Sequence, residues 1–202
     1  MRHHVALSAL SLALLGLPLA AQGVTGGLQA GLSLPVGDFK DKSDWGTNQF
    51  FGAHIGGHID FNITTNHEVR GQLTYHSFPG SGWGGNRDYQ NDFKVLQVGA
   101  DWVYHFQNPS QGWYVIAGAS LNDIKRESEY WPNSGNNSFR ISYSASQSGK
   151  IGVRGGGGLT FNKMFSVEGT LNQVMTDKYG NDGFGFRTAT WAQVSAVFRF
   201  GG

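Results

Sequence analysis

The chain has 202 residues, the size of one ordinary domain, and nothing in its composition indicates a second. It contains no cysteine, which excludes a fold held together by disulfides. Its 15 Lys and Arg against 14 Asp and Glu give a net charge of +1 with histidine neutral, and this excludes the strongly basic surface that nucleic-acid binding requires.

Residues 1–21 have the pattern of a secretory signal peptide. Arg2 precedes an apolar run from Val5 to Leu19, and Ala20 and Ala21 provide the small residues of a cleavage site. The predicted organisation is a cleaved signal peptide over 1–21 and one barrel domain over 22–202. No later apolar stretch approaches the length of a membrane-spanning helix, so strands would have to make any membrane crossing.

Alternation of apolar and polar residues predicts eight strands. The first spans 27–34 and ends at Pro35, because proline cannot donate to a strand ladder. The second, 51–63, has apolar residues or glycine at every odd position and polar residues or glycine at every even one. At about 3.3 Å per residue it is roughly 40 Å long, enough to cross a bilayer even at a steep tilt.

The third predicted strand, 69–77, also keeps its apolar residues at odd positions. Pairing that aligns the two apolar faces places Asp60 directly across from Arg70 on the polar face. The fifth and sixth strands are predicted to run on together as a protruding hairpin, because alternation continues over 139–145. The remaining strands in chain order are 96–106, 113–122, 151–161, 165–172 and 191–200.

The predicted connections alternate between short and long. Three short turns join the second strand to the third, the fourth to the fifth and the sixth to the seventh, whereas the other connections are several times longer. Transmembrane barrels have this arrangement, with short turns in the periplasm and long loops outside, and soluble barrels have no reason for it. Both chain termini are therefore expected on the periplasmic side.

The polar face of the strands indicates an enclosed lumen. It carries mainly Gly, Ser, Thr, Asn, Gln and His, whereas the solvated face of a soluble barrel is normally rich in lysine and glutamate. A soluble barrel with its apolar face inward remains the alternative. Unpaired charges are costly in a confined space, so the charges of this face are predicted to pair. The candidate lumen residues are Asp60, Arg70, Asp101, Arg154, Glu168 and Arg199, with His54, His58, His76 and His105.

Aromatic residues gather in two places. Those near the predicted strand ends fit the interfacial girdles of a membrane protein: Phe61, Phe78, Phe93, Tyr104, Phe106, Trp113, Phe161, Phe165, Phe198 and Phe200. Those in the predicted loops could contact a partner or pack over the barrel mouth: Trp45, Trp83, Tyr89, Tyr130, Trp131, Phe139, Tyr179, Phe184 and Phe186.

These features together resemble the small outer-membrane barrels of the OmpA/OmpX type. The resemblance rests on the signal peptide, the alternating strands, the loop lengths, the segment GLSLPVGDF in the first strand and AQVSAVFRF in the last. It implies an all-β, eight-stranded antiparallel up-and-down transmembrane barrel in the bacterial outer membrane. In that family a terminal aromatic residue is read by the assembly machinery, whereas here Gly201 and Gly202 follow Phe200.

No residue set predicts an enzyme, a cofactor or a metal site. His54 and His58 share a face but lie roughly 13 Å apart along a strand, too far to bind one ion together. His76 and Ser77 are adjacent on a strand, so they point to opposite faces and cannot act as base and nucleophile. Gly155 to Gly158 lacks the GK[ST] ending of a phosphate loop, and its bare backbone is expected to leave lumen space for neighbours such as Arg154 and Glu168.

An eight-stranded barrel has a bore that its own side chains can fill. The expected function is therefore a structural or surface-interaction role, with no enzymatic activity. A narrow channel for ions or small solutes and a lipid-modifying enzyme are the alternatives. The expected partners of this predicted monomer are outer-membrane lipids, the outer-membrane assembly machinery and a surface ligand held by the long loops, with no nucleic acid.

Overall fold

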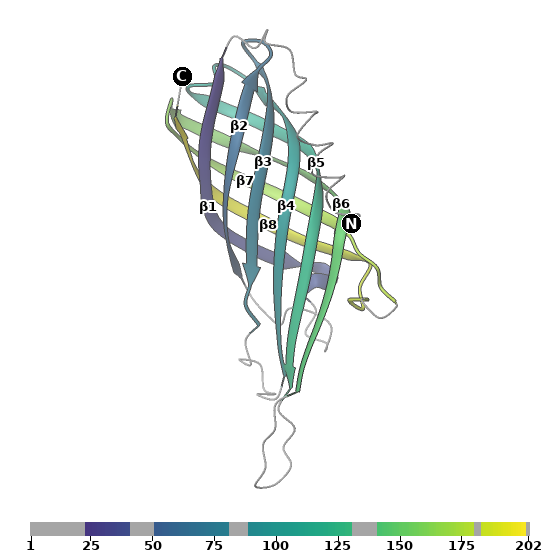
Figure 1. Cartoon of the computed structure of the whole chain (residues 1–202). Coiled ribbons are helices and arrows are strands. Elements are labelled where there is room, and N and C mark those ends of the chain that lie inside the picture. Colours follow the sequence, from purple (N-terminus) through teal and green to yellow (C-terminus); the bar gives the residue numbers. More distant parts are fainter. Residues whose placement is uncertain (1–22, 41–50, 81–88, 131–140, 180–182, 201–202) are drawn as a thin grey trace.

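A computed structural model describes residues 23–40, 51–80, 89–130, 141–179 and 183–200; the predicted signal peptide lies outside them. The described residues form one closed barrel of eight antiparallel strands, in which each strand pairs with the next and β8 pairs with β1 (Figure 1). The predicted fold class is confirmed. The elements are β1 (Val24–Val36), a short 3-10 helix η1 (Gly37–Lys40), β2 (Gly52–Asn62), β3 (His67–Phe78), β4 (Tyr89–His105), β5 (Gly112–Tyr130), β6 (Ile141–Asn162), β7 (Phe165–Met175) and β8 (Thr188–Phe200).

The apolar face of the strands points outward. Leu28 is 58% exposed, Ile55 64% and Leu171 53%, whereas Asp60 and Arg70 are at most 1% exposed. The alternative of a soluble barrel with an apolar interior is therefore wrong. On β7 the outward face runs from Phe165 to Met175, which is about 33 Å of strand and, at a tilt of about 40°, about 25 Å of height. That height matches the lipid-facing band of a transmembrane barrel.

The strand pairing confirms the predicted register between the second and third strands. Asp60 lies directly across from Arg70, and the two faces match along the whole of β2 and β3. The first and last described residues lie at the same end as the turns at 63–66, 106–111 and 163–164. No helix among the described residues is long and apolar enough to cross a membrane.

The end of β1 differs from the prediction. β1 does not end at Pro35 but continues to Val36, and Pro35 pairs with Trp191 of β8. Among the described residues, β1 pairs with β2 only as far as Ser33. Pro35 therefore lies where only one neighbouring strand is paired, and proline is tolerated at such an edge.

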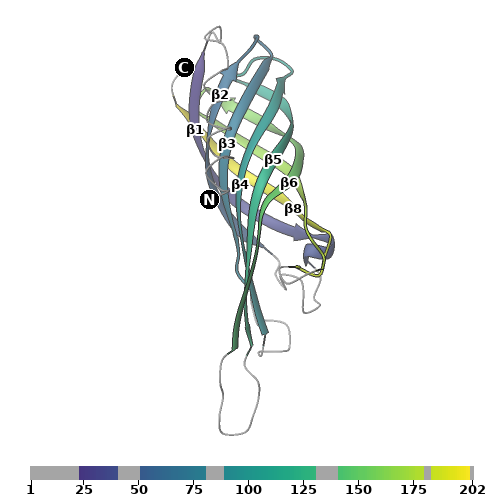
Figure 2. The ribbon, with the colours of Figure 1, turned by 45° about the vertical axis from the view of Figure 1, so that its right-hand side comes forward.

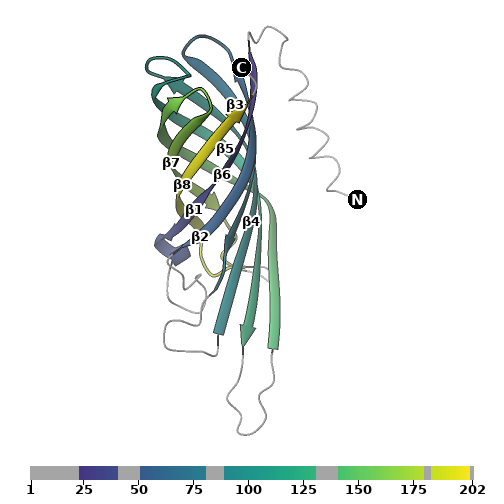
Figure 3. The same ribbon diagram turned by 90° about the vertical axis from the view of Figure 1, so that its left-hand side faces the viewer.

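β4, β5 and β6 continue beyond the other strands as a three-stranded extension on the long-loop side (Figure 2). Figure 3 shows this extension projecting away from the barrel. The predicted hairpin of the fifth and sixth strands is confirmed, but the participation of β4 was not predicted. A bulge near Gly149, whose φ is +68°, shifts the register between β5 and β6. Because of this shift Ala145 faces inward, although Ile151 and Val153 face outward on the same strand.

Charged residues replace apolar ones on the outer face of the extension. Lys94 and Lys125 lie directly across from each other on β4 and β5, and Glu127 accepts hydrogen bonds from both, at 2.7 and 2.6 Å. The hydrogen bond from Lys125, followed by that from Lys94, lowers the pKa of Glu127 to about 2. This group marks the point at which the strands leave the apolar band.

The barrel interior as a candidate functional site

The candidate site is the barrel interior, because the predicted polar residues all point into it. The interior has three parts. Aromatic side chains close the long-loop end, uncharged polar side chains occupy the middle, and charged side chains gather toward the short-turn end. We call these three parts the aromatic plug, the neutral layer and the charged cluster.

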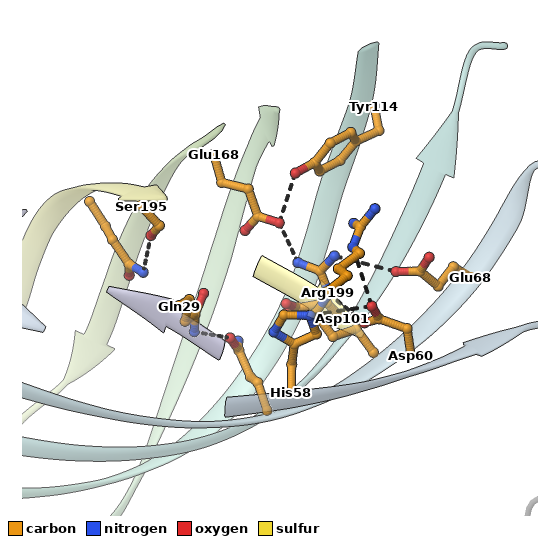
Figure 4. Close-up of polar contacts among 12 residues, drawn as sticks. Gln29, His58, Asp60, Glu68, Asp101, Tyr114, Glu168, Ser195 and Arg199 are labelled. Atoms are coloured by element: carbon orange, nitrogen blue, oxygen red, sulfur yellow. Dashed lines mark hydrogen bonds and ion pairs between the residues drawn. The ribbon is translucent and has the colours of Figure 1, made fainter. Parts of the chain in front are cut away.

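Arg70 is the centre of the charged cluster. Its Nε donates to Asp60 Oδ1 at 2.8 Å, and its Nη1 donates to Glu168 Oε1 at 2.5 Å. Its Nη2 lies 3.4 Å from Glu68 Oε1, and Tyr114 donates its hydroxyl to Glu168 at 2.8 Å (Figure 4). Three carboxylates thus surround one guanidinium that is 1% exposed. A buried charge is tolerated only with such compensation.

The other two arginines make looser contacts. Arg154 Nε lies 3.6 Å from Asp101 Oδ2, and its Nη2 lies 4.0 Å from Glu168 Oε2. Arg199 Nε lies 3.5 Å from Asp60 Oδ2. These separations exceed ordinary hydrogen bonds between nitrogen and oxygen, and separations of this size between charged groups are commonly bridged by water.

All six predicted charged residues meet in this cluster, together with two of the four predicted histidines. His58 Nε2 lies 3.3 Å from Asp60 Oδ2, and His105 Nε2 lies 3.4 Å from Glu68 Oε2. Glu68 and Tyr114 were missed as members. A signal for Glu68 was present, because it has the same parity as Arg70 and lies only two residues away.

His54 and His76 lie in the neutral layer. Both Nδ1 atoms face the Ser33 hydroxyl, at 3.1 and 3.0 Å. His76 is fully buried, while its neighbour Ser77 belongs to the opposite face of β3, as predicted. Ser33 is itself fully buried, and the partners of the two histidines are uncharged: Ser33, Ser195, Gln193 and Gln97. The group therefore lacks both the substrate access and the orienting carboxylate of a nucleophile triad. Among the described residues, no group of three or more His, Asp or Glu side chains could hold a metal ion.

The aromatic plug was not predicted. Phe39 from η1 contacts Phe78 and Phe93 edge to face, with ring centroids 5.0 and 5.2 Å apart. Phe186, from the connection between β7 and β8, lies 5.7 Å from Phe39, and Trp191 of β8 lies 6.2 Å from it. Phe78 and Phe93 were assigned to an interfacial girdle, and this is wrong, because both are fully buried inside the barrel. The strands that carry them reach the long-loop end with these residues on the inward face.

The loop aromatics divide into three sets. Phe184 and Phe186 pack into the barrel mouth at 0 and 4% exposure, whereas Tyr179 is 74% exposed. The structure describes no side chain for the remaining ones, which are Trp45, Trp83, Tyr89, Tyr130, Trp131 and Phe139.

Glycines make room for the large side chains of the charged cluster. A Cβ at Gly158 would lie 2.4 Å from the Tyr114 ring, and one at Gly118 would lie 2.0 Å from an Asp101 oxygen. The prediction that glycines of β6 leave room for lumen side chains is therefore correct. Gly158 serves Tyr114, however, and not Arg154 or Glu168.

Comparison with known proteins found similarity at the level of solved structures. No protein-family model matches the sequence, and no curated protein matches it. Ail, the attachment invasion locus protein of Yersinia pestis, superposes with a TM-score of 0.53 at 12% identity, covering 88% of this chain and 99% of Ail. Neisserial surface protein A gives a TM-score of 0.48 at 14% identity, covering 90% of this chain and 98% of the other. The N-terminal barrel domain of Pseudomonas aeruginosa OprF gives 0.44 at 15% identity, covering 87% and 97%.

The structure and the comparison with Ail lead to the same conclusion. The exterior is apolar over the height of a membrane, the interior is polar, and over that height the described strands close without an edge, as outer-membrane barrels require. In its described residues, the chain is a transmembrane β-barrel of the outer-membrane type, with the fold of the small OmpA/OmpX-like barrels.

Proposed function

We propose that this outer-membrane barrel is a non-enzymatic anchor that holds the β4–β6 extension outside the membrane as a surface for interaction. The observation that carries the proposal is the combination of a filled interior with three strands that continue past the apolar band. A barrel built for diffusion needs a free bore, and an enzyme needs an accessible reactive group.

The extension has the properties of a presented surface. Ile141 and Tyr143 of β6 are 49 and 48% exposed, at a height where lipid no longer covers them. Among the described residues, β7 pairs with β6 only from Gly152 onward, so the edge of β6 before it has no partner strand. Exposed apolar side chains beside a free strand edge favour contact with another macromolecule.

The base of the extension is fixed to the barrel. Gln147 exchanges two hydrogen bonds with the backbone of Asp177, at 2.9 and 2.8 Å, and Lys150 forms an ion pair with the Asp177 carboxylate. The Arg126 guanidinium lies over the rings of Tyr143 and Phe184, 5.7 and 5.8 Å from their centroids. A partner would therefore meet a pre-ordered sheet, which reduces the entropic cost of binding.

The test is a shortened variant in which residues 125–146 are replaced by a tight turn. Cells that display the parent protein should adhere to at least one of a panel of immobilised proteins and glycans, and the shortened variant should lose this adhesion while keeping the heat-modifiable gel mobility of a folded barrel. A double variant, Ile141→Ser with Tyr143→Ser, should weaken adhesion without shortening the sheet. Equal adhesion by parent and shortened variant would reject the proposal, as would altered lipid A on expression of the parent.

A further inference from the structure

Six uncharged side chains of the neutral layer are linked across the barrel directly beside the aromatic plug. They come from six strands and are at most 4% exposed. His76 contacts the plug through Trp191, at 5.1 Å between ring centroids. We call this set the polar ring: Ser33 (β1), His54 (β2), His76 (β3), Gln97 (β4), Asn172 (β7) and Gln193 (β8).

The amides of the polar ring fix the direction of its hydrogen bonds. Gln97 donates its amide nitrogen to Ser120 at 3.1 Å and to Asn172 Oδ1 at 3.5 Å. Asn172 then donates to Gln193 Oε1 at 3.3 Å, so Gln193 presents its own amide nitrogen to His54 Nε2 at 3.2 Å. An amide nitrogen can only donate, and the assignment that satisfies both contacts of His54 Nε2 makes it an unprotonated acceptor, which receives the Gln193 amide and the Ser195 hydroxyl at 2.9 Å.

The tautomers of both histidines follow from this direction. A neutral His54 whose Nε2 accepts must carry its proton on Nδ1, which donates to Ser33 Oγ. The Ser33 hydroxyl is then free to donate to His76 Nδ1, so His76 carries its proton on Nε2. The two histidines thus hold opposite tautomers.

Two side-chain atoms of the polar ring have no close partner, and they support this assignment. They are His76 Nε2 and Gln97 Oε1, which in this scheme are one donor and one acceptor.

We propose that the polar ring is a barrier that stops ions and protons from crossing the barrel, independently of the aromatic plug. It carries no charge, and most of its donors and acceptors are bonded to one another or to neighbouring side chains such as Ser120 and Ser195, so a passing ion would have to break buried hydrogen bonds that it could not replace. Three of its six members are amides, which neither gain nor lose protons near neutral pH, so the ring cannot relay a proton. This role does not depend on what the extension binds.

The first test is nitrogen-15 NMR of the imidazoles in the full-length barrel in detergent micelles, assigned with single His→Gln variants. His54 should show a protonated Nδ1 and His76 a protonated Nε2. Ser33→Ala should abolish the preference of His76 for its tautomer, because His76 Nδ1 loses its donor, whereas His54 should keep its Nδ1 proton because Gln193 still donates to its Nε2. The same tautomer in both histidines, or no effect of Ser33→Ala, would overturn the ring.

The second test separates the ring from the plug by planar-bilayer conductance. All variants carry Arg70→Ala and Glu168→Ala, which remove one charge of each sign, so that the charged cluster does not itself close the bore. In this background Phe184→Ala with Phe186→Ala opens the plug, and this variant should remain at baseline because the ring is intact. Adding His54→Ala and His76→Ala should produce discrete conductance steps. Adding Gln72→Ala instead is the matched control outside the ring, and it should stay at baseline. Equal conductance by the plug variant and the combined variant would overturn the barrier, as would a folded combined variant that remains at baseline.

Discussion

Replacing Arg70 with methionine should destabilise the barrel more than any exposed charge change. The substitution leaves Asp60, Glu68 and Glu168 facing one another without the guanidinium that holds them, 2.8, 3.4 and 2.5 Å away in the parent. Removing one partner of a buried ion pair costs about 3–5 kcal/mol. Because three carboxylates lose their partner at once, we expect the upper part of this range.

The assay is urea unfolding of the folded barrel in detergent, followed by the loss of heat-modifiable mobility and by tryptophan fluorescence. Lys125→Met is the matched control, since it removes a half-exposed partner of Glu127 and should cost at most about 1 kcal/mol. Neutralising the carboxylates in the Arg70→Met background, with Asn or Gln, should recover most of the loss. A loss below about 1 kcal/mol for Arg70→Met, or no recovery on neutralisation, would refute the role of Arg70 as the compensating charge.

Three further outcomes are expected. Leu171→Arg, in the middle of the outward face of β7, should lower the free energy of unfolding in lipid by about 2–4 kcal/mol, whereas Met175→Arg near the rim should lower it by about 1 kcal/mol or less. Equal effects in urea titrations would contradict the position of the apolar band. Gly158→Ala should cost about 1–3 kcal/mol because its Cβ meets a tyrosine ring, and Gly169→Ala, where no atom lies within 4 Å, should be neutral; the same assay compares them. The carboxyl of Glu127 should stay ionised until the pH falls toward 2. Its small stabilising effect should be complete above the unfolded pKa of about 4.3 and should be lost as the pH falls from there toward 2. A carbon-13 titration midpoint near 4 would contradict this.

Most of the correct predictions came from the alternation of side chains along each strand, in which odd and even positions face opposite sides of the sheet. Once Phe51 to Ile63 is read as a strand, the pairing of Asp60 with Arg70 follows from matching faces, and the structure confirms it. Every candidate lumen residue does lie inside the barrel. The grouping of these residues could not be predicted, because Arg70 and Glu168 are 98 positions apart and meet only across the bore.

Wrong assignments arose where local pattern and three-dimensional position disagree. Phe78 and Phe93 are aromatic residues at strand ends, a pattern that indicates an interfacial girdle. In the structure, however, both side chains point into the barrel and pack against Phe39. The shift near Gly149 changes which parity of β6 faces inward, and alternation alone gives no sign of it.

The alternation of side chains along the chain by itself determined the two faces of each strand, because a strand sends successive side chains to opposite faces. The composition of the polar face and the succession of short and long connections then indicated a membrane barrel with an apolar exterior and a polar lumen. Only the closed barrel decided which lumen residues meet. Closure fixes how far each strand is displaced relative to its neighbours and therefore the height at which each inward side chain lies. That height places Arg70 among three carboxylates, His54 and His76 around one serine hydroxyl, and Phe39 over the mouth.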